Sequence, residues 1–159
     1  KTLVSDFNAY HDVHSLIQIR NRYFCFMEKK EIELRPNDLT ITRPWEAHKV
    51  GNPNIGVGKF YWVILDLGVR RPHQNWVWPE WIILAPEDLL RLTTILRQNE
   101  DVRLRSDKRV RDCFQRIGRA VDTDKNCSNS SRIRLLVNYL LILLLDLLDS
   151  ENIANVFLY

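Results

Sequence analysis

The residues best suited to chemistry lie close together in the stretch 44–48, directly after a short apolar segment. Trp45, Glu46 and His48 place an indole, a carboxylate and an imidazole within four positions. Glu46 and His48 are two apart, so in extended backbone their side chains point to the same face. Together with His14 they form a set of two histidines and one carboxylate, which is a set that can hold a divalent metal. The spacing is sparse for a metal site, so we prefer a metal-free pocket in which these groups hydrogen-bond a ligand; a surface or structural role is the third alternative.

Aromatic residues add to this interpretation. The chain has five tryptophans, and aromatic walls with a few polar groups are typical of small-ligand pockets. Trp76, Trp78 and Trp81 lie just before a predicted helix, so we expect them to pack the seam between sheet and helices. Trp45, next to Glu46 and His48, is the tryptophan that we assign to ligand contact.

Motifs for covalent catalysis or phosphate binding are weak. No serine lies in a glycine-flanked elbow, and no cysteine lies near a histidine in the sequence, so no catalytic nucleophile is indicated. The GVGK stretch at residues 56–59 lacks the second half of a phosphate-binding loop, and strand-like sequence follows it instead of a helix. We therefore expect the protein not to be an enzyme and to bind no cofactor.

Short strands must position these groups. Residues 7–84 contain closely spaced stretches that are rich in β-branched and aromatic residues and separated by turn residues. This pattern is typical of an antiparallel sandwich or barrel. Within residues 35–51, Pro36 and Asn37 suit the centre of a tight turn, and an alternating strand pattern follows. We therefore expect the cluster at 44–48 to lie where this strand leaves the sheet.

Helical sequence follows the strands, so residues 1–84 and 85–159 are expected to form two parts of one structural domain. The expected starts of the three helices are Pro86 at a first helical position, Ser106 as an N-cap, and Ser130 or Ser131 as the cap of a helix that runs to about Leu148.

The third predicted helix has more apolar surface than one domain needs to cover. At 100° per residue its polar residues fall within one stripe of about 120°, and the remaining circumference is nearly all apolar. A helix that rests on one domain needs an apolar stripe of about 100° or slightly more. We therefore predict that a second copy of the chain covers part of this helix; the alternative is a central helix covered by the first two. The predicted dimer interface consists of Leu136, Leu140, Leu141, Leu144, Leu145 and Leu148.

Composition excludes several classes of protein. The 159 residues are 45% hydrophobic and 27% charged, which is ordinary for one globular domain. The apolar run at 135–145 is about half as long as a membrane-spanning helix, so we expect no membrane association. A net charge of +3 is too small to predict nucleic-acid binding. We interpret the basic run at 97–119 as a solvated helix face; the alternative is a patch that contacts phosphate. The three widely spaced cysteines predict reduced thiols and a cytoplasmic location.

The turn and strand from residue 34 onward resemble a signature in the sensor domains of AraC-type transcriptional regulators. That signature contains a Pro-Gly-Asp turn, alternating apolar residues, a proline and a histidine. The matching positions in this chain are Pro36, Asp38, Leu39, Ile41, Pro44 and His48. Asn37 replaces the usual glycine, and asparagine tolerates the left-handed conformation that the turn needs. The resemblance extends from about residue 10 to residue 148 and includes the leucine-rich helix.

The resemblance implies an α+β fold, in which a cupin-like antiparallel β-barrel over residues 1–84 precedes a C-terminal bundle of about three helices that pairs two subunits. The implied function is that of an effector-sensing and dimerisation domain, which binds a sugar or another small organic compound in the barrel. DNA is then bound only by a separate domain that this sequence does not contain, and we expect the chain to be a piece of a longer protein. The implied ligand contacts are His14, Arg43, Trp45, Glu46, His48 and Tyr61.

Two points stay open. Tyr61 and Trp62 are adjacent, so their side chains point to opposite faces of a strand. This alternation does not show which of the two faces inward, and we choose Tyr61. The alternative functions are a metal-dependent cupin enzyme and a scaffold without a ligand. Enzymatic cupins usually carry a His-x-His pair with a glutamate and a later histidine, whereas this chain has HDVH at residues 11–14, so we favour ligand sensing.

Overall fold

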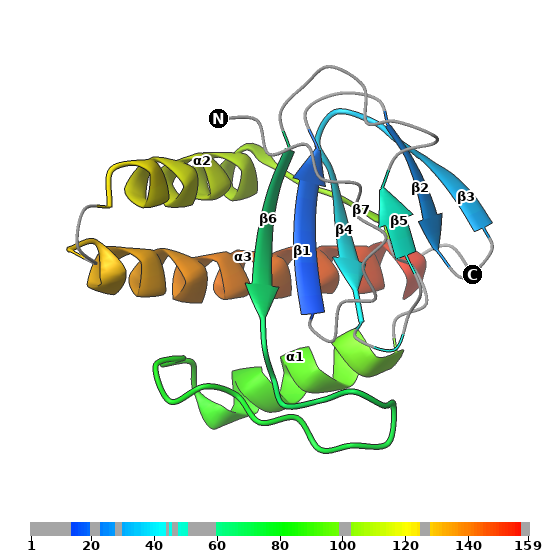
Figure 1. Cartoon of the computed structure of the whole chain (residues 1–159). Helices are drawn as coiled ribbons and strands as arrows, with labels where there is room; N and C mark the ends of the chain where they lie inside the picture. Colours follow the sequence, from blue (N-terminus) through cyan, green and yellow to red (C-terminus); the bar gives the residue numbers. More distant parts are fainter. Residues whose placement is uncertain are drawn as a thin grey trace.

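Figure 1 shows the computed structural model of the chain, which describes residues 14–19, 23–27, 30–43, 45, 48–50, 60–98, 103–124 and 128–156. Within these ranges, side chains are described for residues 32–43, 45, 61–98, 103–124 and 128–149. The elements in chain order are β1 (His14–Ile19), β2 (Tyr23–Met27), β3 (Lys30–Leu34), β4 (Asp38–Thr42), β5 (His48–Val50), β6 (Phe60–Leu65), α1 (Pro86–Gln98), β7 (Arg103–Arg105), α2 (Lys108–Asp122) and α3 (Ser130–Val156).

The described strands form two open sheets. One has four strands in the order β6-β1-β4-β7, the other has three in the order β3-β2-β5, and every described pair is antiparallel. No described strand pairs with both sheets, so the prediction of a cupin-like β-barrel is wrong. Alternating apolar residues indicate which face of a strand is buried, but they do not indicate which strand lies beside it, and closure of a barrel depends on the neighbours. The short edge strand β7 has no counterpart among the predicted strands.

A tight turn at residues 35–38 starts β4 and connects it to α2. Asn37 has a φ of 73°, so the expected left-handed conformation is confirmed. The Asp38 N–H donates to the Arg35 carbonyl at 3.0 Å, and the Asp38 carboxylate accepts from the Arg35 N–H at 2.8 Å. The Asn37 carbonyl accepts from the N–H of Ser106 at 2.9 Å and from its hydroxyl at 2.8 Å, while the Asn37 side chain accepts from Arg111 at 2.9 Å. The turn therefore anchors β4 to the beginning of α2.

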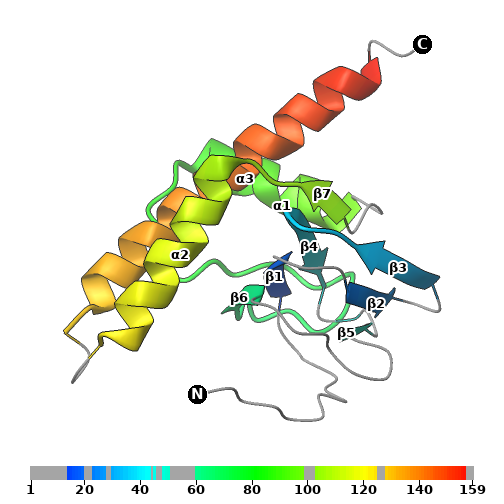
Figure 2. The ribbon, with the colours of Figure 1, turned by 90° about the horizontal axis from the view of Figure 1, so that it is seen from above.

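Three helices follow the main strands, as predicted. α1 begins at Pro86, as expected, whereas the start of α2 and the end of α3 differ from the expected ones. The N-cap of α2 is Asp107, whose carboxylate accepts from the Val110 N–H at 3.0 Å, and not Ser106. α3 continues to Val156, past the predicted end, and Figure 2 shows its C-terminal end extending beyond the other elements. No helix in the described part of the chain has the length and hydropathy needed to cross a membrane.

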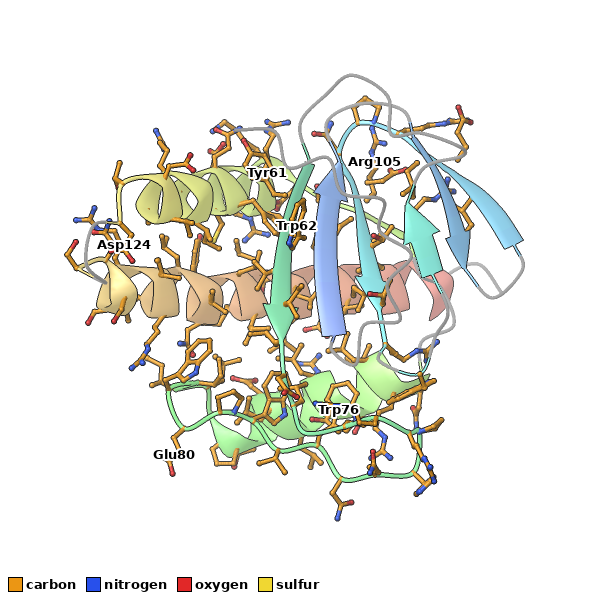
Figure 3. The ribbon with its side chains drawn as sticks, viewed as in Figure 1. Tyr61, Trp62, Trp76, Glu80, Arg105 and Asp124 are labelled. Atoms are coloured by element: carbon orange, nitrogen blue, oxygen red, sulfur yellow. The ribbon has the colours of Figure 1, made fainter. Side chains whose placement is uncertain are left out.

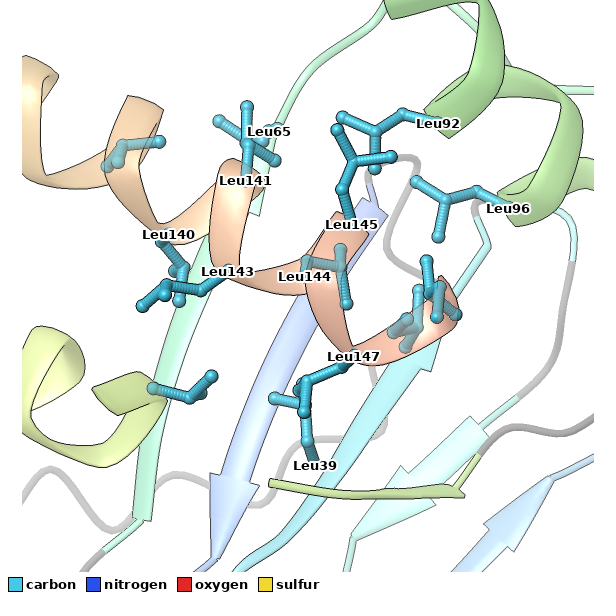
Figure 4. Packing of buried hydrophobic residues seen from close by; sticks show 14 of the residues in the cluster. Leu39, Leu65, Leu92, Leu96, Leu140, Leu141, Leu143, Leu144, Leu145 and Leu147 are labelled. Atoms are coloured by element: carbon cyan, nitrogen blue, oxygen red, sulfur yellow. The ribbon is translucent and has the colours of Figure 1, made fainter. Parts of the chain in front are cut away.

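The helices cover one face of the four-stranded sheet, and the hydrophobic core lies between these layers. In Figure 1, β6, β1 and β4 of this sheet cross in front of α3, with α2 and α1 on either side of it. Figure 4 shows leucines from three sources in this core: Leu39 and Leu65 from the sheet, Leu92 from α1, and Leu141 and Leu144 from α3. The tryptophans before α1 pack against the same core, in agreement with the predicted seam. The sheet, α1 and α2 thus decide which part of α3 stays exposed.

Candidate functional site

The predicted ligand contacts at the end of β4 are engaged in structural interactions. The Arg43 guanidinium donates from Nη1 to the carbonyl of Arg97, in the last turn of α1, at 3.0 Å, and lies 5.9 Å from the centroid of the Trp45 ring. Trp45 is half-buried and packs against the hydrophobic core. A cation at a helix C-terminus satisfies carbonyl groups that lack intrahelical donors. Arg43 and Trp45 therefore connect the exit of β4 to α1.

Tyr61 lies away from these residues, on the helix-covered face of the sheet. Its ring centroid is 6.4 Å from that of Phe114, and a Cβ placed on Gly118 would lie 3.3 Å from Tyr61 Cε1, so the ring packs closely under α2. Trp62 points to the other face and is 48% exposed. Figure 3 shows both side chains on β6. Tyr61 of β6 and Leu39 of β4 pair with the same residue of β1, so they lie side by side across the sheet. Leu39 is three residues, or about 10 Å, from Thr42, the last residue of β4 before Arg43. The structure therefore does not bring Tyr61 together with Arg43 and Trp45.

The predicted metal set lies outside the described side chains. The backbone of His14 belongs to the four-stranded sheet, where it pairs with Leu65, whereas the backbone of His48 pairs with Met27 in the three-stranded sheet. Glu46 lies outside the described residues altogether. Among the residues that are described, no group of three His, Cys, Asp or Glu side chains is placed to hold a metal ion.

The leucines predicted to form a dimer interface mostly lie in the core of the chain itself. Leu140, Leu141, Leu144, Leu145 and Leu148 are all buried, and Leu136 is half-buried. The prediction assigned the polar residues of this helix to one stripe. Asn138, one of them, is only 4% exposed: its side chain accepts from the Ile83 N–H at 2.7 Å and donates to the Trp81 carbonyl at 3.1 Å. The sheet, α1, α2 and the segment before α1 therefore cover the part of α3 that the prediction assigned to a partner.

A different face of α3 remains exposed and forms a continuous line. Leu135 is 61% exposed, and Tyr139 and Ile142 are each 45% exposed. Arg132 and Asp146, also exposed, continue the line at its two ends. We call these five residues the α3 stripe. Their spacing of three, four, three and four positions is that of the contact seam of a coiled coil. Apolar residues at the neighbouring positions of α3 have a similar spacing, so the sequence alone does not distinguish this line from the buried face.

An arginine on α2 supports the C-terminal end of the α3 stripe. Arg109 donates from Nε to Asp107 at 2.7 Å and from Nη1 to Asp146 at 2.9 Å. Both carboxylates raise the pKa of Arg109. Burial acts to raise the pKa of Asp107, but the hydrogen bond from the Val110 N–H and the Arg109 guanidinium outweigh it, so this pKa lies below its usual value. Asp146 is thus held beside α2 by Arg109, and its second carboxylate oxygen has no donor among the described side chains.

The one cysteine whose side chain is described is poorly suited to nucleophilic chemistry. Cys113 is buried on α2, and its thiol contacts the Leu136 carbonyl at 3.3 Å. Burial raises the pKa of Cys113 to about 11, so the sulfur stays protonated at neutral pH. Cys113 therefore serves the packing of α2 against α3.

Comparisons with known proteins assign no family to the chain. A scan against protein-family models finds no match, and a search of the curated proteins finds no match either.

Proposed function

We propose that this chain is the effector-sensing and dimerisation domain of a regulator resembling the AraC type, and that two copies pair through the α3 stripe. The exposed, aligned side chains of Leu135, Tyr139 and Ile142 carry the pairing part of the proposal. Single exposed apolar residues are normal on protein surfaces, whereas a contiguous apolar row is typical of an interface. Ile83 is 70% exposed, and its N–H donates a hydrogen bond to the side chain of Asn138 on α3. It therefore adds an apolar residue beside this row.

Charge at the two ends of the α3 stripe favours an antiparallel pair. Arg132 and Asp146 lie seven positions before and after Tyr139, about 10 Å to each side along the helix. When two stripes cross antiparallel near Tyr139, Arg132 of each copy approaches Asp146 of the other. A parallel pair would instead place like charges together. The stripe is therefore complementary to a second copy of itself under twofold symmetry, which is the commonest symmetry of homodimers.

The effector-sensing part of the proposal is supported by the resemblance at residues 34–48, including the turn at Asn37, and not by a described pocket. A ligand that binds the folded chain raises its melting temperature according to its concentration and affinity. A thermal-shift screen of sugars and small aromatic acids tests this part, and it would be abandoned if no compound of either class stabilised the protein. DNA binding would belong to a separate domain, as in regulators of this type.

The pairing is tested by light scattering on the wild type and on Tyr139→Asp. The substitution places two carboxylates at the centre of the proposed interface, so we expect a dimeric mass for the wild type and a monomeric mass for the variant. Leu90→Asp is the matched control, because Leu90 is 69% exposed on α1 and lies outside the α3 stripe. This control should remain dimeric.

Two results would contradict the pairing. One is a monomeric wild type at about 100 µM, a concentration at which even a micromolar interface is mostly occupied. The other is an equal mass for Tyr139→Asp and the wild type. Charges at Leu141 or Leu145 would not test the interface, because both residues belong to the core and their replacement would unfold the chain.

A further inference from the structure

A surface groove lies between α2 and the first turns of α3, on elements that Figures 1 and 2 both show side by side. Its volume is about 520 Å³, within the range of pockets that hold small molecules. We call it the α2–α3 groove. It is lined by Arg116, Arg119, Ala120, Thr123, Arg132 and Leu136.

Three arginines in this groove have no anionic partner among the described residues. In the part of the chain that the structure describes, the side chains of Arg116, Arg119 and Arg132 make no hydrogen bond or ion pair, and no residue lining the groove is acidic. Asp112 is close enough for Arg116 to lower its pKa, but its carboxylate forms an ion pair with Lys108. Two other arginines of the described helices do have anionic partners: Arg91 pairs with Asp149, and Arg109 pairs with Asp107 and Asp146. The groove therefore concentrates positive charge that the described side chains leave uncompensated.

Helix capping does not explain the cluster. Basic side chains near the C-terminus of a helix often interact with its last carbonyl groups. At the end of α2 these carbonyls already have donors: the Arg119 carbonyl accepts from the N–H of Thr123 at 3.1 Å and from its hydroxyl at 2.8 Å, and the Ala120 carbonyl accepts from Asn129 at 2.9 Å. In addition, Arg116 and Arg119 are three positions apart on one helix, a spacing at which like charges repel. Their placement costs stability unless an anion is bound.

We propose that the α2–α3 groove binds a small organic anion with at least two negative charges, carried by phosphate or carboxylate groups. A guanidinium donates two parallel hydrogen bonds to either group, and three such groups around one groove match a multiply charged ligand. Leu136 and Ala120 provide an apolar surface for the carbon skeleton of the ligand. The concave shape between two helices suits a small molecule better than the convex backbone of a DNA duplex. Arg116 and Arg119 lie outside the α3 stripe and are available to this anion whether or not two chains pair, whereas Arg132 belongs to both the groove and the stripe.

The experiment measures binding of pyrophosphate, of citrate and of a short DNA duplex by calorimetry, at a constant ionic strength of about 0.15 M. We expect pyrophosphate or citrate to bind the wild type, and the stronger of the two to identify phosphate or carboxylate as the preferred group. Replacing Arg116 and Arg119 together by glutamine should weaken this binding by at least about tenfold, since two charge-assisted donors are lost. Arg134→Gln is the matched control, because Arg134 is exposed on α3 but does not line the groove. It should bind like the wild type.

The proposal is overturned if neither small anion binds below about 10 mM, a weak limit for a specific site, or if the double variant binds them as well as the wild type does. Tighter binding of the duplex through the same two arginines would also overturn it, in favour of a nucleic-acid surface. All three replaced arginines are exposed, so the variants are expected to fold, and circular dichroism verifies this. Arg116 and Arg119 lie outside the α3 stripe, so light scattering on the same samples separates a failure of this site from a failure of pairing.

Discussion

Replacing Asn138 by alanine should remove the main polar link between α3 and the segment that precedes α1. The Asn138 side chain accepts from the Ile83 N–H at 2.7 Å and donates to the carbonyls of Trp81 and Arg134 at 3.1 and 2.9 Å. It is 4% exposed and therefore shielded from water. The first two bonds hold the Trp-rich segment against the middle of the helix, beside the α3 stripe.

The expected loss of stability follows from the two backbone groups left without a partner. An unsatisfied polar group costs about 1–3 kcal/mol when it is buried. Ile83 is exposed and Trp81 is half-buried, so water can reach both groups and the lower end of this range applies. The free energy of unfolding should therefore fall by about 2 kcal/mol, a large fraction of the 5–15 kcal/mol of a typical domain.

Urea unfolding, followed by circular dichroism and tryptophan fluorescence at one fixed protein concentration, measures this loss. Asn138→Leu is the informative control, since leucine has a similar size but forms none of the three hydrogen bonds. If hydrogen bonding is the cause, leucine and alanine should destabilise the chain to a similar extent. A cost below about 0.5 kcal/mol for alanine, within the scatter of ordinary surface substitutions, or full stability of the leucine variant, would refute the reasoning.

Three further predictions concern α2. Asp107→Ala should lower the free energy of unfolding by about 1 kcal/mol through loss of the N-cap bond to Val110. Because the pKa of Asp107 is lowered in the folded state, its contribution is present above its unfolded pKa of about 4 and is lost as the pH falls through the folded value. Urea titrations should therefore show a difference between wild type and variant at pH 7 that shrinks below pH 4; a constant difference would contradict this linkage. Gly118→Leu should cost about 1–3 kcal/mol in thermal unfolding, because even a Cβ there lies 3.3 Å from the Tyr61 ring, and an unchanged melting temperature would contradict the packing. Cys113, with its pKa raised to about 11 by burial, should resist iodoacetamide at pH 8 until the chain unfolds, and mass spectrometry of the native protein should find it unmodified.

Local features were the ones that sequence patterns predicted well. The left-handed Asn37 follows from the chemistry of the turn itself, because asparagine adopts this conformation more easily than most residues. The packing of Trp78 between strands and helices was likewise predicted; its indole N–H donates to the Thr93 hydroxyl of α1 at 2.9 Å. Both features depend on residues near each other in the sequence, on a tight turn in one case and on the segment directly before α1 in the other.

Features that depend on distant neighbours were not predictable in the same way. Closure of a barrel requires each edge strand to find a partner, and periodicity within one strand contains no information on that partner. On α3, the apolar circumference is so wide that periodicity alone did not distinguish Leu141, which faces the core, from Ile142, which faces outward. The burial of Asn138 was not predicted, because the sequence does not show whether an asparagine side chain is solvated or is buried with good hydrogen bonds.

The distance between two spin labels at residue 131 tests the antiparallel pairing most directly. Ser131 is exposed on α3, eight positions before Tyr139. In an antiparallel pair centred on Tyr139, the two sites are separated by about 24 Å along the helices, and in a parallel pair only by the interhelical distance of about 10 Å. Ser131→Cys is labelled after Cys25 and Cys127 are changed to serine, while Cys113 stays buried and protonated. A distance of about 25 Å by pulsed electron paramagnetic resonance is the predicted result; a distance near 10 Å, or no coupling between labels at all, would contradict the pairing through the α3 stripe.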